Sequence, residues 1–155
     1  MADTNFLATL DDPMLFREAN YINGLWLGVG EGRSITVTNP ATGKVLGRVP
    51  SFGASETALA IAAAKRAQPA WRALTAKERA VKLRHLFELM ITHREDLARI
   101  MTAEQGKPLA ESRGEITYAA SFIEWFAEEG KRVYGDTIAS HSTSSRIIVQ
   151  KEPIG

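Results

Sequence analysis

The segment from Ile116 to Gly135 reads ITYAASFIEWFAEEGKRVYG and predicts one long helix. On a helix with 3.6 residues per turn its polar residues form a single continuous strip, with only Glu129 outside it. The strip consists of Thr117, Ser121, Glu124, Glu128, Lys131 and Arg132. Because the rest of the circumference is apolar, we expect this helix to be covered from more than one side.

The apolar part of this helix divides into three flanks. The first carries Ile116, Ala120, Ile123, Ala127 and Tyr134. The second carries Ala119 and Phe126, and the third carries Tyr118, Phe122, Trp125 and Val133. We expect that these 155 residues do not cover all the flanks, so that the segment is a scaffold completed by further polypeptide.

The expected ends of the helix are marked by residues that suit helix termini. Pro108 suits the first helical turn, and Gly135 suits the position just past the end, where a left-handed conformation is wanted. Lys131 and Arg132 suit the last turn, where Glu128 can reach both of them. Gly114 is unfavourable in a helix interior and indicates a bend or a close approach by another backbone.

The composition is that of a soluble globular protein of one domain. Of the 155 residues 45% are hydrophobic and 24% are charged, and the net charge of +1 favours neither nucleic acid nor a membrane surface as partner. With no cysteine there is no disulfide, thiolate metal site or cysteine nucleophile within these residues. The first residues resemble neither a secretory nor a mitochondrial address, and no stretch is long enough to span a membrane, so we expect a cytoplasmic location.

The first half of the chain predicts short hairpins after a lead-in. Residues 1–18 suggest a frayed or short helix, and Asn23-Gly24 predicts a type I′ turn in a hairpin over 21–26. Gly28, Gly30 and Gly32 fall in a loop, where Arg33 stands in place of the last glycine of a dinucleotide fingerprint. Two further strands are expected at 34–38 and 45–50, on either side of the turn 39–43.

The second half predicts helices. Ser55 is expected to cap a helix through Ala67, which Pro69 ends or kinks. Thr75 and Glu78 form a capping box before the apolar positions Ala80, Leu83, Phe87, Met90 and Ile91. Thr92 with Glu95 offers a second cap, so we expect a break near His93 and then a helix to Gly106. Residues 136–145 are expected to be a loop, and 146–150 a strand without a partner in this sequence.

The polar candidates for a chemical site are weak. His85, His93 and His141 are scattered without metal-ligand spacing, and we interpret them as surface or helix-end residues. The carboxylate pairs Glu111/Glu115 and Glu124/Glu128 are better explained as solvated charged faces than as acid–base pairs. Gly106-Lys107 lacks the flanking residues of a phosphate loop. No catalytic, cofactor-binding or metal residue is therefore assigned.

The aromatic flank of Tyr118, Phe122 and Trp125 is the remaining candidate. Aromatic residues at helical spacing are usually core residues. The same residue types would form one wall of an apolar ligand channel, so both interpretations stay open.

Several motifs together resemble the aldehyde dehydrogenase superfamily, and within it the bacterial succinate-semialdehyde dehydrogenases. They are the segments 21–24 (YING), 39–43 (NPATG), 70–72 (AWR), 104–108 (EQGKP) and 121–135 (SFIEWFAEEGKRVYG). The resemblance covers about 16–155. It implies an NAD- or NADP-dependent oxidation of an aldehyde to an acid, in which a cysteine attacks the aldehyde and a glutamate activates water.

This resemblance implies that the chain is an N-terminal third, with the nucleophile and the cofactor contacts lying further on. The fold class implied is α/β for the whole enzyme, while this segment is mainly α, with short N-terminal hairpins and an unpaired C-terminal strand. The regions implied are a lead-in (1–18), hairpins and helices packing on the cofactor domain (19–135), the first arm of an oligomerisation hairpin (136–152) and the start of the cofactor domain (153–155).

In such enzymes the helix over 116–135 borders the substrate entrance, so the resemblance implies that Tyr118, Phe122 and Trp125 are channel residues. It also implies a homo-oligomer, a dimer or tetramer, and no binding of NAD or NADP by this segment alone. Two alternatives remain: a stand-alone helical interaction module, and a dehydrogenase for another aldehyde such as glutarate semialdehyde.

Overall fold

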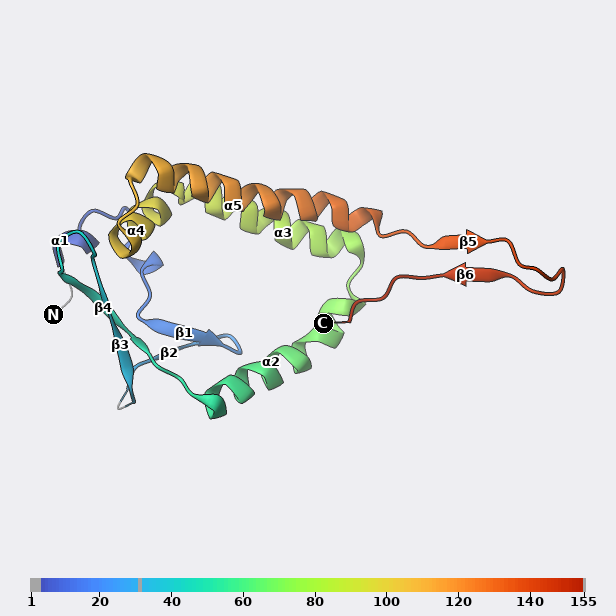
Figure 1. The fold of residues 1–155 in the computed structure, drawn as a ribbon, viewed down its shortest axis with the longest axis horizontal. Helices are drawn as coiled ribbons and strands as arrows, with labels where there is room; N and C mark the ends of the chain where they lie inside the picture. Colours follow the sequence, from blue (N-terminus) through green and yellow to red (C-terminus); the bar gives the residue numbers. More distant parts are fainter. Residues whose placement is uncertain (1–3, 31, 155) are drawn as a thin grey trace.

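The computed structural model describes residues 4–30 and 32–154, which form helices and three antiparallel strand pairs (Figure 1). The helices are α1 (Thr4–Leu7), α2 (Ala54–Ala73), α3 (Ala76–Thr92), α4 (Arg94–Gln105) and α5 (Leu109–Glu129), with short 3-10 turns at Pro13–Leu15 and Gly130–Arg132. The strands are β1 (Ala19–Ile22), β2 (Leu25–Gly28), β3 (Ser34–Thr38), β4 (Val45–Pro50), β5 (Asp136–Ile138) and β6 (Ile147–Val149). The expected mainly helical segment with short hairpins is confirmed.

The two N-terminal hairpins follow the turn chemistry of the sequence. Asn23 and Gly24 both have positive φ, 52° and 83°, as a type I′ turn requires between β1 and β2. In the turn between β3 and β4, the Asn39 side chain accepts hydrogen bonds from the backbone N–H groups of Ala41 and Thr42. Within residues 4–18 of the expected lead-in, helix is confined to α1 and the 3-10 turn Pro13–Leu15, while residues 1–3 lie outside the described part.

Helix α2 differs from its predicted bounds at both ends. Gly53, not Ser55, is the N-cap, because the Glu56 side chain reaches back to the Gly53 N–H. Pro69 does not end the helix, which continues to Ala73. A proline inside a helix removes the hydrogen bond to the carbonyl four residues before it and crowds that carbonyl, which here belongs to Lys65, an exposed residue.

The break between α3 and α4 lies at His93, as predicted, but without the predicted cap. Thr75 and Glu78 form the expected capping box at the start of α3. Thr92 is the last residue of α3 instead of the cap of α4, and His93 separates the two helices without a side-chain cap. Gly106 ends α4 in the left-handed conformation, with φ 77°.

Helix α5 ends earlier than the sequence suggests. Its last α-helical residue is Glu129, and a 3-10 turn continues to Arg132, so Gly135 is not its C-cap. Pro108 is the N-cap instead of a residue of the first turn. No neighbouring atom lies within 4 Å of a Cβ built at Gly114, so another backbone does not approach there.

The C-terminal strand has a partner, which corrects the prediction of an unpaired strand. Strand β6 pairs antiparallel with β5, in register from Asp136 opposite Val149 to Ile138 opposite Ile147. The segment 136–145, expected to be a loop throughout, therefore begins with a strand. A three-residue strand with one strongly apolar residue gives almost no periodic signal, which explains why it was missed.

The core lies where α5 packs against α3, which runs alongside it, and against α4, which lies near its N-terminal end (Figure 1). Its buried residues are mostly small: Ala80, Ala98, Ala103, Ile116, Ala120 and Ala127. Helix α2 lies apart from this group, with Ala63 as its only buried residue, and the β5–β6 hairpin projects away from the helices (Figure 1). None of the helices described here combines the length and apolar character needed to cross a membrane.

Candidate functional site

One flank of α5 is buried and the other two are open. Ile116 is 8% exposed, and Ala120 and Ala127 are fully buried against α3 and α4. In contrast, Tyr118 is 65% exposed and Trp125 is 64% exposed. Tyr134, which the sequence also assigned to the first flank, is 68% exposed. The described chain therefore does not cover all the apolar flanks, as the sequence predicts.

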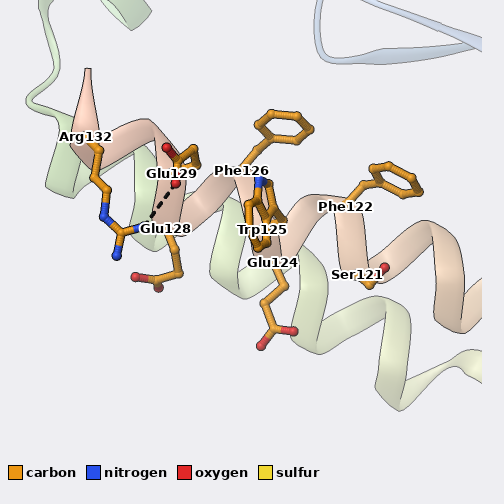
Figure 2. A pocket seen from close by; sticks show the side chains of 8 residues that line it. All are labelled: Ser121, Phe122, Glu124, Trp125, Phe126, Glu128, Glu129 and Arg132. Atoms are coloured by element: carbon orange, nitrogen blue, oxygen red, sulfur yellow. Dashed lines mark hydrogen bonds and ion pairs between the residues drawn. The ribbon is translucent and has the colours of Figure 1, made fainter. Parts of the chain in front are cut away.

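The open side of α5 holds an apolar groove of about 640 Å³ (Figure 2). Phe122, Trp125 and Phe126 supply its apolar part, and Phe122 and Phe126 project from the side of α5 opposite to Glu124 and Glu128. Tyr118 lies outside the groove, but its ring packs edge-on against Phe122 with the centroids 4.8 Å apart. Of the three sequence candidates, two line the groove and the third extends it.

Phe126 is a groove residue that the sequence analysis did not select. It was assigned to a separate flank with Ala119, yet it lies beside Phe122 and Trp125 and is 58% exposed. The signal was present in the sequence, because residues four apart on a helix are neighbours and Phe126 follows Phe122 by four. The two open flanks thus form one continuous aromatic surface.

Ion pairs to α3 and α4 set which side of α5 faces outward. Arg84 on α3 donates a hydrogen bond of 2.8 Å to Glu124, and Arg113 on α5 donates two to Glu95 on α4. Lys107, just before α5, pairs with Glu115. These contacts lie on the polar strip and near the start of the helix, so they hold the aromatic surface toward solvent.

The end of the groove near the C-terminus of α5 carries charged residues in local pairs. Lys131 lies 2.7 Å from Glu128, and the hydrogen bond from Lys131 lowers the pKa of Glu128 below its ordinary value. Arg132 pairs with Glu129 at 3.0 Å instead of with Glu128 as expected. Ser121 also lines the groove, and its hydroxyl donates a hydrogen bond to the backbone carbonyl oxygen of Tyr118. With a paired rim and three aromatic side chains, the arrangement can bind apolar surface.

The polar candidates are dispersed, as the sequence analysis interprets them. His85 and His141 are exposed on α3 and in the β5–β6 loop, and His93 separates α3 from α4. Glu111 is exposed at the start of α5, and Gly106 serves as a helix C-cap. Across the described ranges, no cluster of three His, Cys, Asp or Glu side chains could hold a metal ion.

Comparison with known proteins places this arrangement in a family. The model of the aldehyde dehydrogenase family matches residues 26–155. Glutarate-semialdehyde dehydrogenase of Pseudomonas putida is 65% identical over 146 residues, which are 94% of this chain and 30% of that protein. The NADP(+) succinate-semialdehyde dehydrogenase of Escherichia coli has the same identity and the same coverage.

A solved structure has the same fold over nearly the whole chain. The crystal structure of succinate-semialdehyde dehydrogenase from Burkholderia pseudomallei matches with a TM-score of 0.92 and 56% identity, covering 95% of this chain and 30% of that one. The chain thus spans about 30% of the length of the relatives it matches. Because the family model matches well over half of its residues, the chain belongs to the aldehyde dehydrogenase family.

Proposed function

We propose that this chain forms the N-terminal part of a subunit that oxidises succinate semialdehyde to succinate with NAD or NADP. The observation that carries the proposal is the 65% identity with a succinate-semialdehyde dehydrogenase over 94% of the chain. Glutarate semialdehyde is the alternative substrate, because a glutarate-semialdehyde dehydrogenase is equally identical. The two substrates differ by one methylene, a difference that an apolar pocket discriminates only weakly.

In this proposal the chemistry belongs to polypeptide beyond residue 155. The resemblance implies a cysteine nucleophile, and the 155 residues contain no cysteine. The helices of 19–135 would pack on a cofactor domain, and the apolar surface of α2 supports this, since Leu59, Ile61 and Trp71 are 42–65% exposed. We accordingly propose that NAD or NADP binds only when that domain is present.

The β5–β6 hairpin is proposed to join subunits into a dimer or tetramer. Its support is that the hairpin projects from the helices and exposes Ile138, Ile147, Ile148 and Val149 (Figure 1). An isolated two-stranded hairpin is marginally stable in water, so a partner surface would stabilise it. Both arms of this hairpin lie within 136–152, where the sequence predicted only the first arm.

Tyr118, Phe122 and Trp125 are proposed to line the substrate entrance, with Phe126 beside them. The proposal is supported by their common surface on α5 and by the groove that three of them line. Their role would be to exclude water and to orient the aldehyde chain, because aromatic side chains present large rigid apolar faces.

A chimeric subunit tests the proposal. Residues 1–155 would replace the matching 30% of the E. coli relative, and the purified chimera would be assayed for cofactor reduction with succinate semialdehyde and with glutarate semialdehyde. We expect kcat/KM within about tenfold of the parent enzyme, because 65% of the 146 matched residues are identical. A folded chimera of the parent's oligomeric state without activity would contradict the proposal.

Two further activity measurements test the proposed function. The chain of 155 residues alone is expected to reduce neither NAD nor NADP with either aldehyde. Any such activity would refute the proposal that the catalytic residues lie beyond residue 155. In the chimera, Trp125→Ala is expected to raise KM and leave kcat nearly unchanged. Val81→Ala, a change at another exposed apolar residue on α3, serves as the control.

A further inference from the structure

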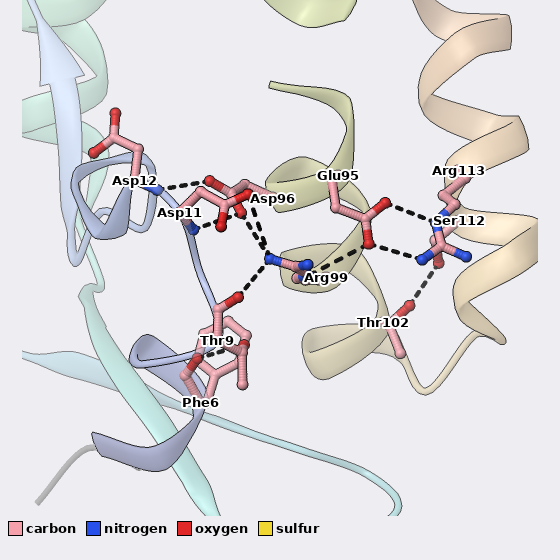
Figure 3. A network of polar contacts seen from close by, with 10 residues as sticks. All are labelled: Phe6, Thr9, Asp11, Asp12, Glu95, Asp96, Arg99, Thr102, Ser112 and Arg113. Carbon is pink, nitrogen blue, oxygen red and sulfur yellow. Dashed lines mark hydrogen bonds and ion pairs between the residues drawn. The ribbon is translucent and has the colours of Figure 1, made fainter. Parts of the chain in front are cut away.

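A buried carboxylate on α4 binds the main chain of the N-terminal lead-in (Figure 3). Asp96 is 3% exposed, and its two oxygens accept hydrogen bonds from the backbone N–H groups of Asp11 at 2.9 Å and Asp12 at 2.8 Å. These residues are more than 80 positions apart in the sequence. A buried charge is stable only when it is paired or hydrogen-bonded, so this carboxylate depends on the lead-in.

The lead-in is held by backbone groups instead of by its own acidic side chains. Arg99 donates a hydrogen bond of 2.5 Å to the carbonyl oxygen of Thr9, and Leu10 between these groups is 6% exposed. The Asp11 carboxylate is 84% exposed and lies 3.7 Å from Arg99, a contact that solvent weakens. The binding therefore depends on the path of the chain over 9–12 more than on its side-chain charge.

The same network continues to α5. Arg99 lies 3.4 Å from Glu95, and Glu95 accepts two hydrogen bonds of 2.7 Å from Arg113 on α5 (Figure 3). Thr102 on α4 and the fully buried Ser112 on α5 are hydrogen-bonded at 2.9 Å beside it. A continuous polar path thus connects the lead-in through α4 to the first turns of α5.

The lead-in is itself closed into a compact unit. The rings of Phe6 and Phe16 pack edge-on with their centroids 5.4 Å apart, on either side of the segment that α4 holds. Asp12 caps the short turn Pro13–Leu15 by accepting from the Met14 N–H. Because the two ends of the segment contact each other, binding its middle to α4 fixes the whole segment 6–16.

We infer that residues 6–16 are a strap that Asp96 fastens to α4, and that the fastened strap holds the first turns of α5 in place through Arg99, Glu95 and Arg113. Asp96 is then a positioning residue. Loss of its carboxylate releases the strap and loosens the start of α5, while the aromatic half of α5 remains packed on α3. This inference does not depend on the proposed function.

Amide hydrogen exchange by NMR on the chain of 155 residues tests the strap. In the unaltered chain the amides of Asp11 and Asp12 are expected to be protected. Asp96→Asn removes one acceptor and places an NH₂ group against a backbone N–H, so protection of both amides is expected to fall on the order of tenfold or more. Exchange at 111–114 is expected to rise as well, whereas exchange at 120–127 stays unchanged.

Two control variants separate the strap from general destabilisation. Asp136→Asn makes the same charge change on exposed β5 and is expected to alter neither region. Asp11→Asn is expected to keep both amides protected, because the backbone N–H and not the carboxylate is bound. Unprotected amides at 11 and 12 in the unaltered chain, or a uniform rise of exchange along α5 in Asp96→Asn, would overturn the inference.

If Asp96→Asn does not fold, the same hydrogen-exchange measurement on Arg99→Lys tests the inference. A single ammonium cannot reach Thr9, Asp96 and Glu95 together, but the Asp96 carboxylate keeps its two backbone donors. The amides of Asp11 and Asp12 are then expected to stay protected while 111–114 exchange faster. Equal exchange at 111–114 before and after the change would show that the path to α5 carries no coupling.

Discussion

Arg113 of α5 donates two parallel hydrogen bonds to Glu95 of α4, each 2.7 Å long. The hydrogen bond from Arg113 is also the main reason why the pKa of Glu95 lies below its ordinary value. A planar guanidinium matches the geometry of a carboxylate with two donors, which a lysine cannot do. This pair therefore joins α5 to α4, one of the two helices that cover its buried flank.

Arg113→Lys is expected to lower the melting temperature by a few degrees, because one of the two hydrogen bonds is lost between α4 and α5. Circular dichroism during heating measures the change. Arg132→Lys is the matched control, since Arg132 pairs with Glu129 at the exposed end of α5 and contributes little. Equal shifts of the melting temperature in the two variants would show that the Arg113–Glu95 pair stabilises the fold no more than the Arg132–Glu129 pair.

Stability is expected to fall in acid through Asp96. Burial alone would raise the pKa of Asp96, but the N–H groups of Asp11 and Asp12, with the charges of Arg99 and His93, outweigh burial and hold the pKa below its ordinary value. The carboxylate thus contributes its full stabilisation above the unfolded pKa of about 4, and loses it as the pH falls through the lower folded value.

Urea unfolding across a pH series measures this dependence. The charged groups near Asp96 are Arg99, His93, Glu95 and the Asp11 carboxylate, and Glu95 also has a lowered pKa, so it acts in the same direction. The Asp96→Asn variant is expected to show a flatter decline of unfolding free energy below about pH 4. A decline as steep as in the unaltered chain would contradict the assignment to Asp96.

Gly135→Ala is expected to disturb the β5–β6 hairpin and leave the helices intact. A Cβ at Gly135 would collide with the backbone carbonyl oxygen of Val149, and backbone cannot move aside as a flexible side chain can. Hydrogen exchange at 136–149 is expected to rise. Gly130→Ala is the control, because a Cβ there meets no atom within 4 Å and φ is −59°, and it is expected to stabilise by up to about 1 kcal/mol.

The open and buried flanks of α5 are expected to respond differently to truncation. Ile116→Ala removes a buried side chain and is expected to cost about 2–5 kcal/mol of unfolding free energy. Trp125→Ala, at a site 64% exposed, is expected to change it by less than about 0.5 kcal/mol while lowering the binding of an apolar dye. A large loss of stability in Trp125→Ala would show that this chain covers the aromatic surface itself.

Local sequence signals predicted most of the elements. Asn23-Gly24, the Thr75/Glu78 box and the left-handed Gly106 each act within a few residues of the chain, so their conformations follow from residue type and spacing. At Pro69 the sequence left an end or a kink open, and α2 does not end there but continues to Ala73. A proline inside a helix removes one hydrogen bond and crowds the carbonyl four residues before it, and the sequence does not show that the rest of α2 tolerates this.

By itself, the sequence determined that α5 is a long helix with one polar strip and more apolar surface than one neighbour can cover. Only the tertiary structure decided which flank is buried, that β5 pairs with β6, and that Asp96 holds the lead-in. The physical reason is distance along the chain. Helical periodicity and capping are set by neighbours within about four residues, whereas the contact between Asp12 and Asp96 joins positions 84 apart and leaves no periodic trace in the sequence.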